Sequence, residues 1–169
     1  NLSNKAKPFA SKDMADLINY GHQLNINDIE AWDIAYLSEK IKEERFNYSE
    51  QDIKSYFPDH KVIEGLFKVV ESIYGIFIKK ENTEVWHKDV KFYKITNKSE
   101  ELIGYFYLDL YARKNKRGGA WMDEAISKFR FNDEHTHPVA YLTCNFSEPV
   151  HNDVSLLNHD EVITLFHEF

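Results

Sequence analysis

The spacing of apolar residues divides the chain into a helical first part and a second part with strand character. Up to residue 75, apolar positions recur three and four residues apart, as expected for helices with one buried face. The clearest helical face ends in a glycine and contains Val62, Leu66, Val69, Val70, Ile73 and then Gly75. Glycine is favoured just after the end of a helix, so the sequence predicts that this helix ends at Gly75.

Three further helices are expected before it. Ser11 is a candidate N-cap for a helix that runs toward His22, and Asp28 is expected to open the next helix. Ser49, followed three residues later by Asp52, resembles a capping arrangement for a short third helix.

From residue 76 the pattern changes to β-branched and aromatic residues, which favour strands. The strand candidates are residues 76–78, 85–95, 103–111 and 139–146. The polar residues 97–101 predict a turn, so the second and third candidates are expected to form a hairpin. A polar loop with two adjacent glycines, residues 113–119, lies before the last strand.

The last residues predict a helix that starts at a capping box. Asn158 can accept a hydrogen bond from the backbone of Glu161, whose side chain can reach back. The apolar positions that follow share one helical face and are Val162, Leu165, Phe166 and Phe169. His167 and Glu168 interrupt this face, and polar groups beside a buried surface require a reason.

Together these elements predict an α+β fold. We expect a helical lobe at residues 1–75, a small, mostly antiparallel sheet with loops at 76–157, and the start of a final helix at 158–169. The length of 169 residues fits one domain.

Composition limits the classes of function. Apolar residues make up 43% of the chain and aromatic residues 15%, which argues against disorder. The formal charge of −7 disfavours a nucleic-acid partner. We expect no membrane span, because the chain has no run of apolar residues long enough. With Cys144 as the only cysteine and no signal peptide recognised, we expect a cytoplasmic protein without internal disulfides.

His167, Glu168 and Phe169 match the first three positions of an H-E-x-x-H motif. On a helix, two histidines four residues apart can bind one zinc ion, and the glutamate can act as a general base. The tripeptide alone has little specificity, because most histidine–glutamate pairs are ordinary solvated helix residues.

The surrounding sequence resembles a known family. The segment LNHDEVITLFHEF at 157–169 is similar to the zinc helix of the thimet oligopeptidase family, and most closely to its bacterial oligopeptidase A branch. The resemblance continues through WDIAY at 32–36, YFP at 56–58, VWH at 85–87, FYLDLYAR at 106–113, KRGGAWMD at 116–123 and PVAYLTCNF at 138–146.

The resemblance implies that residues 1–169 are part of the catalytic domain of a zinc metalloendopeptidase that hydrolyses short peptides. The chain would end inside the family's H-E-F-G-H motif, before the second histidine and a later glutamate ligand. His167 would be the first ligand of a single Zn²⁺ ion and Glu168 the general base. No organic cofactor is implied.

An alternative concerns the chain by itself. It would then be a catalytically inactive fragment that serves as a structural or peptide-binding scaffold. One histidine is too few for tight zinc binding. The exposed face of its C-terminal helix would also allow self-association.

Three other features allow two interpretations each. Residues 139–146 form either an edge strand that pairs with an extended peptide or a core strand with Cys144 as a small apolar residue. The basic loop lacks the spacing of a phosphate-binding motif, so a solvated or substrate-adjacent loop is expected for Arg113, Lys114, Lys116 and Arg117. A metal site or a polar turn explains the cluster Asp133, Glu134, His135 and His137.

Overall fold

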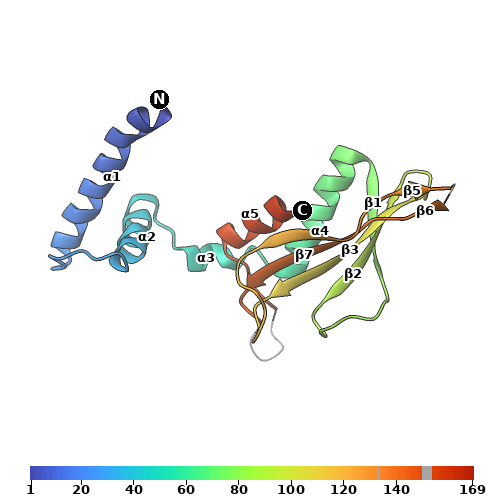
Figure 1. The fold of residues 1–169 in the computed structure, drawn as a ribbon. Helices are drawn as coiled ribbons and strands as arrows, with labels where there is room; N and C mark the ends of the chain where they lie inside the picture. Colours follow the sequence, from blue (N-terminus) through green and yellow to red (C-terminus); the bar gives the residue numbers. More distant parts are fainter. Residues whose placement is uncertain (133, 150–153) are drawn as a thin grey trace. The chain divides into compact units, whose positions relative to one another are not determined.

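The computed structural model describes residues 1–132, 134–149 and 154–169 (Figure 1). Within these residues it contains five helices, a mixed five-stranded sheet and a separate two-stranded sheet. This α+β composition confirms the predicted fold class. The chain divides into two compact units, Asn1–Ile53 and Lys54–Phe169, each described below by itself.

The first unit pairs helix α1 (Leu2–Gln23) with helix α2 (Asp33–Phe46). The predicted N-cap at Ser11 is wrong, because the N-cap of α1 lies ten residues earlier, where the Asn1 side chain accepts from the Ser3 amide at 3.1 Å. The predicted helix start at Asp28 is also wrong. The connection folds back against α1 there, so closely that a Cβ on Gly21 would lie 2.8 Å from Ile29 Cδ1.

Helix α3 (Glu50–Lys54) has the predicted cap, since the Asp52 amide donates to Ser49 Oγ and the Ser49 amide donates to Asp52 Oδ2. Helix α4 (Asp59–Tyr74) ends, as predicted, at Gly75 with a left-handed φ of 65°. Its predicted apolar face is only partly buried. Val69 and Ile73 are exposed, because the helix turns Ile63 toward the core instead.

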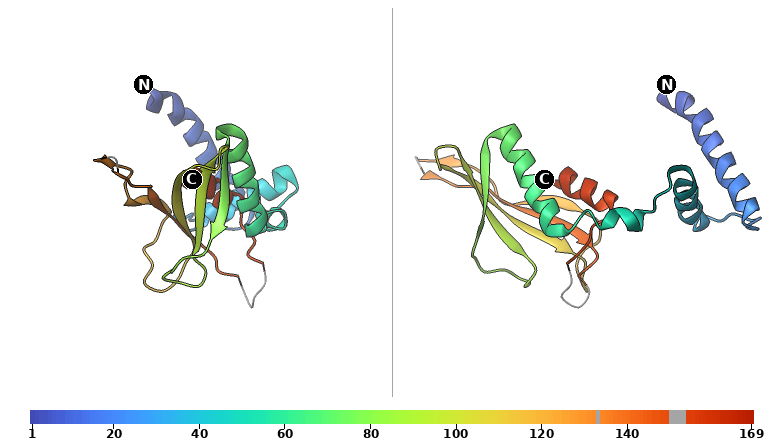
Figure 2. Two further views of the ribbon diagram at one scale, coloured as in Figure 1. Left: turned by 90° about the vertical axis from the view of Figure 1, so that its right-hand side faces the viewer. Right: turned by 180° about the vertical axis from the view of Figure 1, so that it is seen from behind.

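The main sheet has the order β1-β2-β3-β7-β4 (Figure 2). Its strands are β1 (Ile76–Glu81), β2 (Lys91–Asn97), β3 (Leu102–Tyr111), β4 (Trp121–Ile126) and β7 (Val139–Phe146). Only β3 and β7 pair in parallel; the other three neighbouring pairs among the described strands are antiparallel, which confirms the mostly antiparallel sheet. The short strands β5 (Arg130–Phe131) and β6 (Glu134–His135) pair with each other.

Two strand predictions need correction. The predicted hairpin is present as β2 and β3, but β2 starts at Lys91 and not at Val85. Residues before it make a turn, with the Val90 amide bonded to the His87 carbonyl. Strand β4 was not predicted at all, because its mixed polar sequence lacks a strict alternation.

Helices α4 and α5 (His159–Glu168) lie on the same face of the sheet (Figures 1 and 2). The core between them includes Leu66 from α4, Leu165 from α5, and Phe106, Leu142 and Cys144 from the strands. The predicted capping box of α5 is confirmed, because the Asn158 amide donates to Glu161 Oε2 at 2.8 Å and the Glu161 amide donates to Asn158 Oδ1 at 2.7 Å.

Candidate functional site

His167 and Glu168 lie in the last turn of α5, and the burial of Leu165 sets their orientation. Leu165 is fully buried against the sheet. Residues three apart share a helical face, whereas residues two apart do not. Glu168 is therefore turned toward the sheet and half-buried, and His167 is exposed.

Glu168 lines a groove of about 610 Å³ on the helical face of the sheet. The walls of this groove are mostly apolar, and include Phe166 and Phe169 from α5 and Ile73 from α4. Burial, and next the charge of Glu168, raise the pKa of the Cys144 thiol on β7 to about 12.

Strand β4 forms one edge of the sheet, and no described strand pairs with its outer side. Met122 and Glu124 of β4 line the same groove as Glu168. Of the two interpretations of residues 139–146, the edge strand is wrong, because β4 pairs along β7 and places it inside the sheet. The alternative, a core strand with a buried Cys144, is confirmed.

The basic loop before β4 is anchored on β3. Arg113 makes two hydrogen bonds of 2.7 Å to the carboxylate of Asp109, and Lys116 makes one of 2.8 Å. Burial would raise the pKa of Asp109, but these bonds and one from Trp86 hold it below its ordinary value. Arg113 and Lys116 thus serve a buried ion-pair cluster, which the loop's polar sequence did not reveal.

The residues described in both units include no group of three histidine, cysteine, aspartate or glutamate side chains that could hold a metal ion. Of the predicted histidine cluster, His135 is exposed on β6, and Asp133 lies outside the described residues. No hydrogen bond or ion pair with another described residue engages the His167 imidazole. Its chemistry therefore fits one zinc ligand, and further ligands would have to come from elsewhere.

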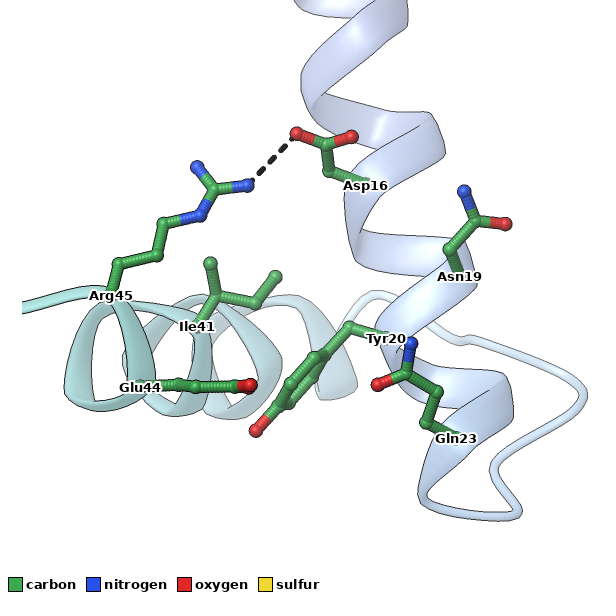
Figure 3. Close-up of a pocket in the computed structure, with 7 residues that line it drawn as sticks. All are labelled: Asp16, Asn19, Tyr20, Gln23, Ile41, Glu44 and Arg45. Carbon is green, nitrogen blue, oxygen red and sulfur yellow. Dashed lines mark hydrogen bonds and ion pairs between the residues drawn. The ribbon is translucent and has the colours of Figure 1, made fainter.

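Figure 3 shows a hollow between α1 and α2 in the first unit. Across it, Arg45 of α2 forms an ion pair of 3.0 Å with Asp16 of α1. The hollow has no arrangement of groups suited to catalysis. Among the described residues, no helix has the length and apolar character needed to cross a membrane.

Comparison with known proteins places these features in context. The sequence profile of peptidase family M3 matches residues 1–169. Oligopeptidase A of Escherichia coli K12 is 47% identical over 171 residues, which cover 99% of this chain and 25% of that protein. Dipeptidyl carboxypeptidase of the same organism is 38% identical over 140 residues, 82% of this chain and 20% of that protein.

A plant protein is also similar. The organellar oligopeptidase A of Arabidopsis thaliana is 36% identical over 170 residues, which cover 95% of this chain and 22% of that protein. The chain thus spans about a quarter of the length of the curated relatives that it matches.

Proposed function

The chain belongs to peptidase family M3, and from that premise we propose that it is part of the catalytic domain of a zinc metalloendopeptidase acting on short peptides. One observation carries the proposal: the Glu168 carboxylate and two residues of the edge strand β4 line the same groove. A general base and a peptide-binding edge are the two parts that hydrolysis of an extended peptide requires.

Strand β4 is proposed to bind the substrate backbone. Its outer amide and carbonyl groups can pair with an extended peptide as an additional strand, which gives affinity without a fixed side-chain sequence. Met122 and Glu124 would contact the peptide's side chains on the groove side. This assigns to β4 the role that the sequence suggested for residues 139–146.

Glu168 is proposed as the general base. It would accept a proton from the attacking water at a carboxylate oxygen and later deliver that proton to the leaving amine nitrogen. Glu168 is half-buried, and the apolar side chains of Phe166 and Phe169 line the groove beside it.

His167 is proposed as a zinc ligand through its free imidazole. When bound, zinc would supply Lewis acidity and lower the pKa of a water molecule toward about 7. Catalytic zinc sites use three protein ligands, and the described residues offer His167 alone at this helix end. By itself the chain is therefore proposed to be inactive, as a scaffold that completes a larger fold.

The substrate class is supported by the names of the relatives, which are oligopeptidases and a dipeptidyl carboxypeptidase. The groove is open at the surface and its lining is mainly apolar, so it suits a flexible peptide with apolar side chains.

The proposal is tested on the full-length enzyme with an internally quenched peptide. We expect cleavage that is lost with a chelator and restored by zinc. Glu168→Gln should lower kcat by about 10²–10⁴-fold, the usual contribution of a general base, with zinc still bound. Near-normal kcat in this variant would reject the role of Glu168, and chelator-resistant cleavage would reject the metalloenzyme.

A further inference from the structure

One side chain of the neighbouring strand makes two hydrogen bonds to the backbone just before the edge strand β4. Asn145 on β7 donates from its amide Nδ2 to the carbonyl of Arg117 at 2.8 Å and to the carbonyl of Gly119 at 2.6 Å. Trp121, the first residue of β4, follows two residues after Gly119 and pairs with Thr143. The Asn145 amide therefore fixes the backbone immediately before the peptide-binding edge.

Side-chain packing does not hold the two glycines of this turn, although Ala120, which follows them, packs against the core. A Cβ added to Gly118 or Gly119 would meet no atom within 4 Å, so both glycines face open space. Gly119 also has a φ of 85°, which L side chains rarely adopt. With no packing around the glycines themselves, polar contacts to the flanking strands act together with Ala120 to define the position of the turn.

The other end of the loop is held from β3. Lys116 Nζ donates to the Asp109 carbonyl at 3.0 Å and to the Tyr111 carbonyl at 2.7 Å. These contacts fix the loop where it leaves β3, three residues before Gly119. Between Lys116 and Trp121, the described side-chain contacts to the loop backbone are the two made by Asn145.

We propose that Asn145 is a positioning residue for the peptide substrate, which it serves by setting the position and register of the free edge of β4. The inference rests on the proposed function, because it assumes that β4 pairs with the peptide. Only a side chain with two N–H donors at this length can hold both carbonyls. Aspartate has the same shape but only accepts, so it would face two carbonyl oxygens with a negative charge.

The test compares Asn145→Asp with wild type in the full-length enzyme. A matched control is Asn97→Asp, which removes a side-chain amide donating to Glu101 Oε2 at 2.6 Å in the turn between β2 and β3. Zinc content, amide hydrogen exchange of residues 117–126, and kcat and KM are measured. The substrates are two quenched peptides, one short and one extended enough to pair along β4.

For Asn145→Asp we expect faster exchange in 117–126 and a KM for the longer peptide raised about tenfold, with a smaller rise for the short one. Zinc content and kcat should stay within about twofold, because losing binding that is equal in the ground state and the transition state raises KM alone. Asn97→Asp should change none of these values by more than about twofold.

An unchanged KM for the longer peptide would overturn the inference, even if exchange increased. So would a loss of zinc or an equal fall in kcat for both peptides, since either indicates general structural damage. If wild type itself had no cleavage that Glu168→Gln removes, the proposed function would fail. An active wild type matched by Asn145→Asp would reject only the role of Asn145.

Discussion

Lys116 Nζ lies 2.8 Å from Asp109 Oδ1, and both side chains are only 5% exposed. A buried charge is costly unless it is paired, and removal of one partner leaves the other uncompensated. Arg113 and Trp86 donate to the same carboxylate, so Asp109 is the centre of the cluster. The cluster joins the loop before β4 to strand β3.

Asp109→Asn should therefore lower the free energy of unfolding by about 3–5 kcal/mol, the range for a broken buried pair. Urea unfolding of wild type and variant measures the difference. Asp16→Asn is the control, because it breaks the exposed Asp16–Arg45 pair and should cost at most about 1 kcal/mol. Equal effects of the two variants would contradict the assignment.

The same cluster predicts a dependence of stability on pH. Burial acts to raise the pKa of Asp109, but the hydrogen bonds from Arg113 and Lys116 outweigh it and lower the pKa below the ordinary value of 3.8. Stabilisation by a carboxylate with a lowered folded-state pKa is complete above the unfolded-state value and is lost as the pH falls through the folded-state pKa.

The difference in unfolding free energy between wild type and Asp109→Asn should thus be constant near neutral pH and shrink below about pH 3.8. Urea unfolding at a series of pH values from neutral downward measures it. A difference that begins to shrink well above that pH would show that Asp109 is not held in its charged form.

Cys144 should be unreactive in the folded protein. Burial, together with the nearby Glu168 charge, raises its pKa to about 12, so at pH 8 about one thiol in ten thousand is a thiolate. Iodoacetamide should leave it unmodified in native protein under conditions that fully label it in urea. Rapid labelling of native protein, with folding checked by circular dichroism, would contradict this.

The parts of the fold that sequence predicted correctly depend on local signals. The Asn158–Glu161 capping box, the Gly75 cap and the turn of the β2–β3 hairpin are each determined within a few residues. The errors at Ser11, Asp28 and Val85 concern where an element begins, whereas the remaining errors concern long-range partners. No local pattern tells that β4 pairs along β7, which is why residues 139–146 were considered a possible edge.

The candidate site shows the same division. His167 and Glu168 could be named from the sequence because their motif is contiguous, and they remain proposals for zinc binding and catalysis. The sequence did not reveal Asn145, because it bonds to the backbone of Arg117 and Gly119, more than twenty residues away. It did not reveal Asp109 either, because the charges that this carboxylate binds lie across a turn.

Zinc binding should separate the isolated chain from the full-length enzyme. The chain should retain no stoichiometric zinc after dialysis, because His167 alone is far short of three ligands. The full-length enzyme should hold one zinc, and His167→Ala should remove it, as measured by metal analysis. Tight zinc binding by the isolated chain that depends on His167 would contradict the ligand assignment, provided that the chain is monomeric.

The last prediction concerns helix α5 in the isolated chain. The helix spans ten residues, and helices this short are marginal in water without tertiary packing. Leu165 is fully buried, but Phe166 is 41% exposed and Phe169 37% exposed beside the apolar groove. The first turn is fixed by the capping box and by the Leu157 amide, which donates to the Phe57 carbonyl at 2.9 Å.

We therefore expect protection from amide hydrogen exchange to fall along α5, from strong near Val162 to weak near Phe169, in dilute monomer. Raising the protein concentration should increase protection at Phe166 and Phe169 if two chains cover these faces by self-association. Leu165→Ala should remove the protection of the whole helix, since about 2–5 kcal/mol is lost when a buried leucine is truncated. The control Ile163→Ala alters an exposed position on the same helix and should leave the gradient intact.

Uniform strong protection through Phe169 in a verified monomer would mean that the sheet and α4 suffice to dock the complete helix. It would also remove the reason to expect self-association through its exposed face.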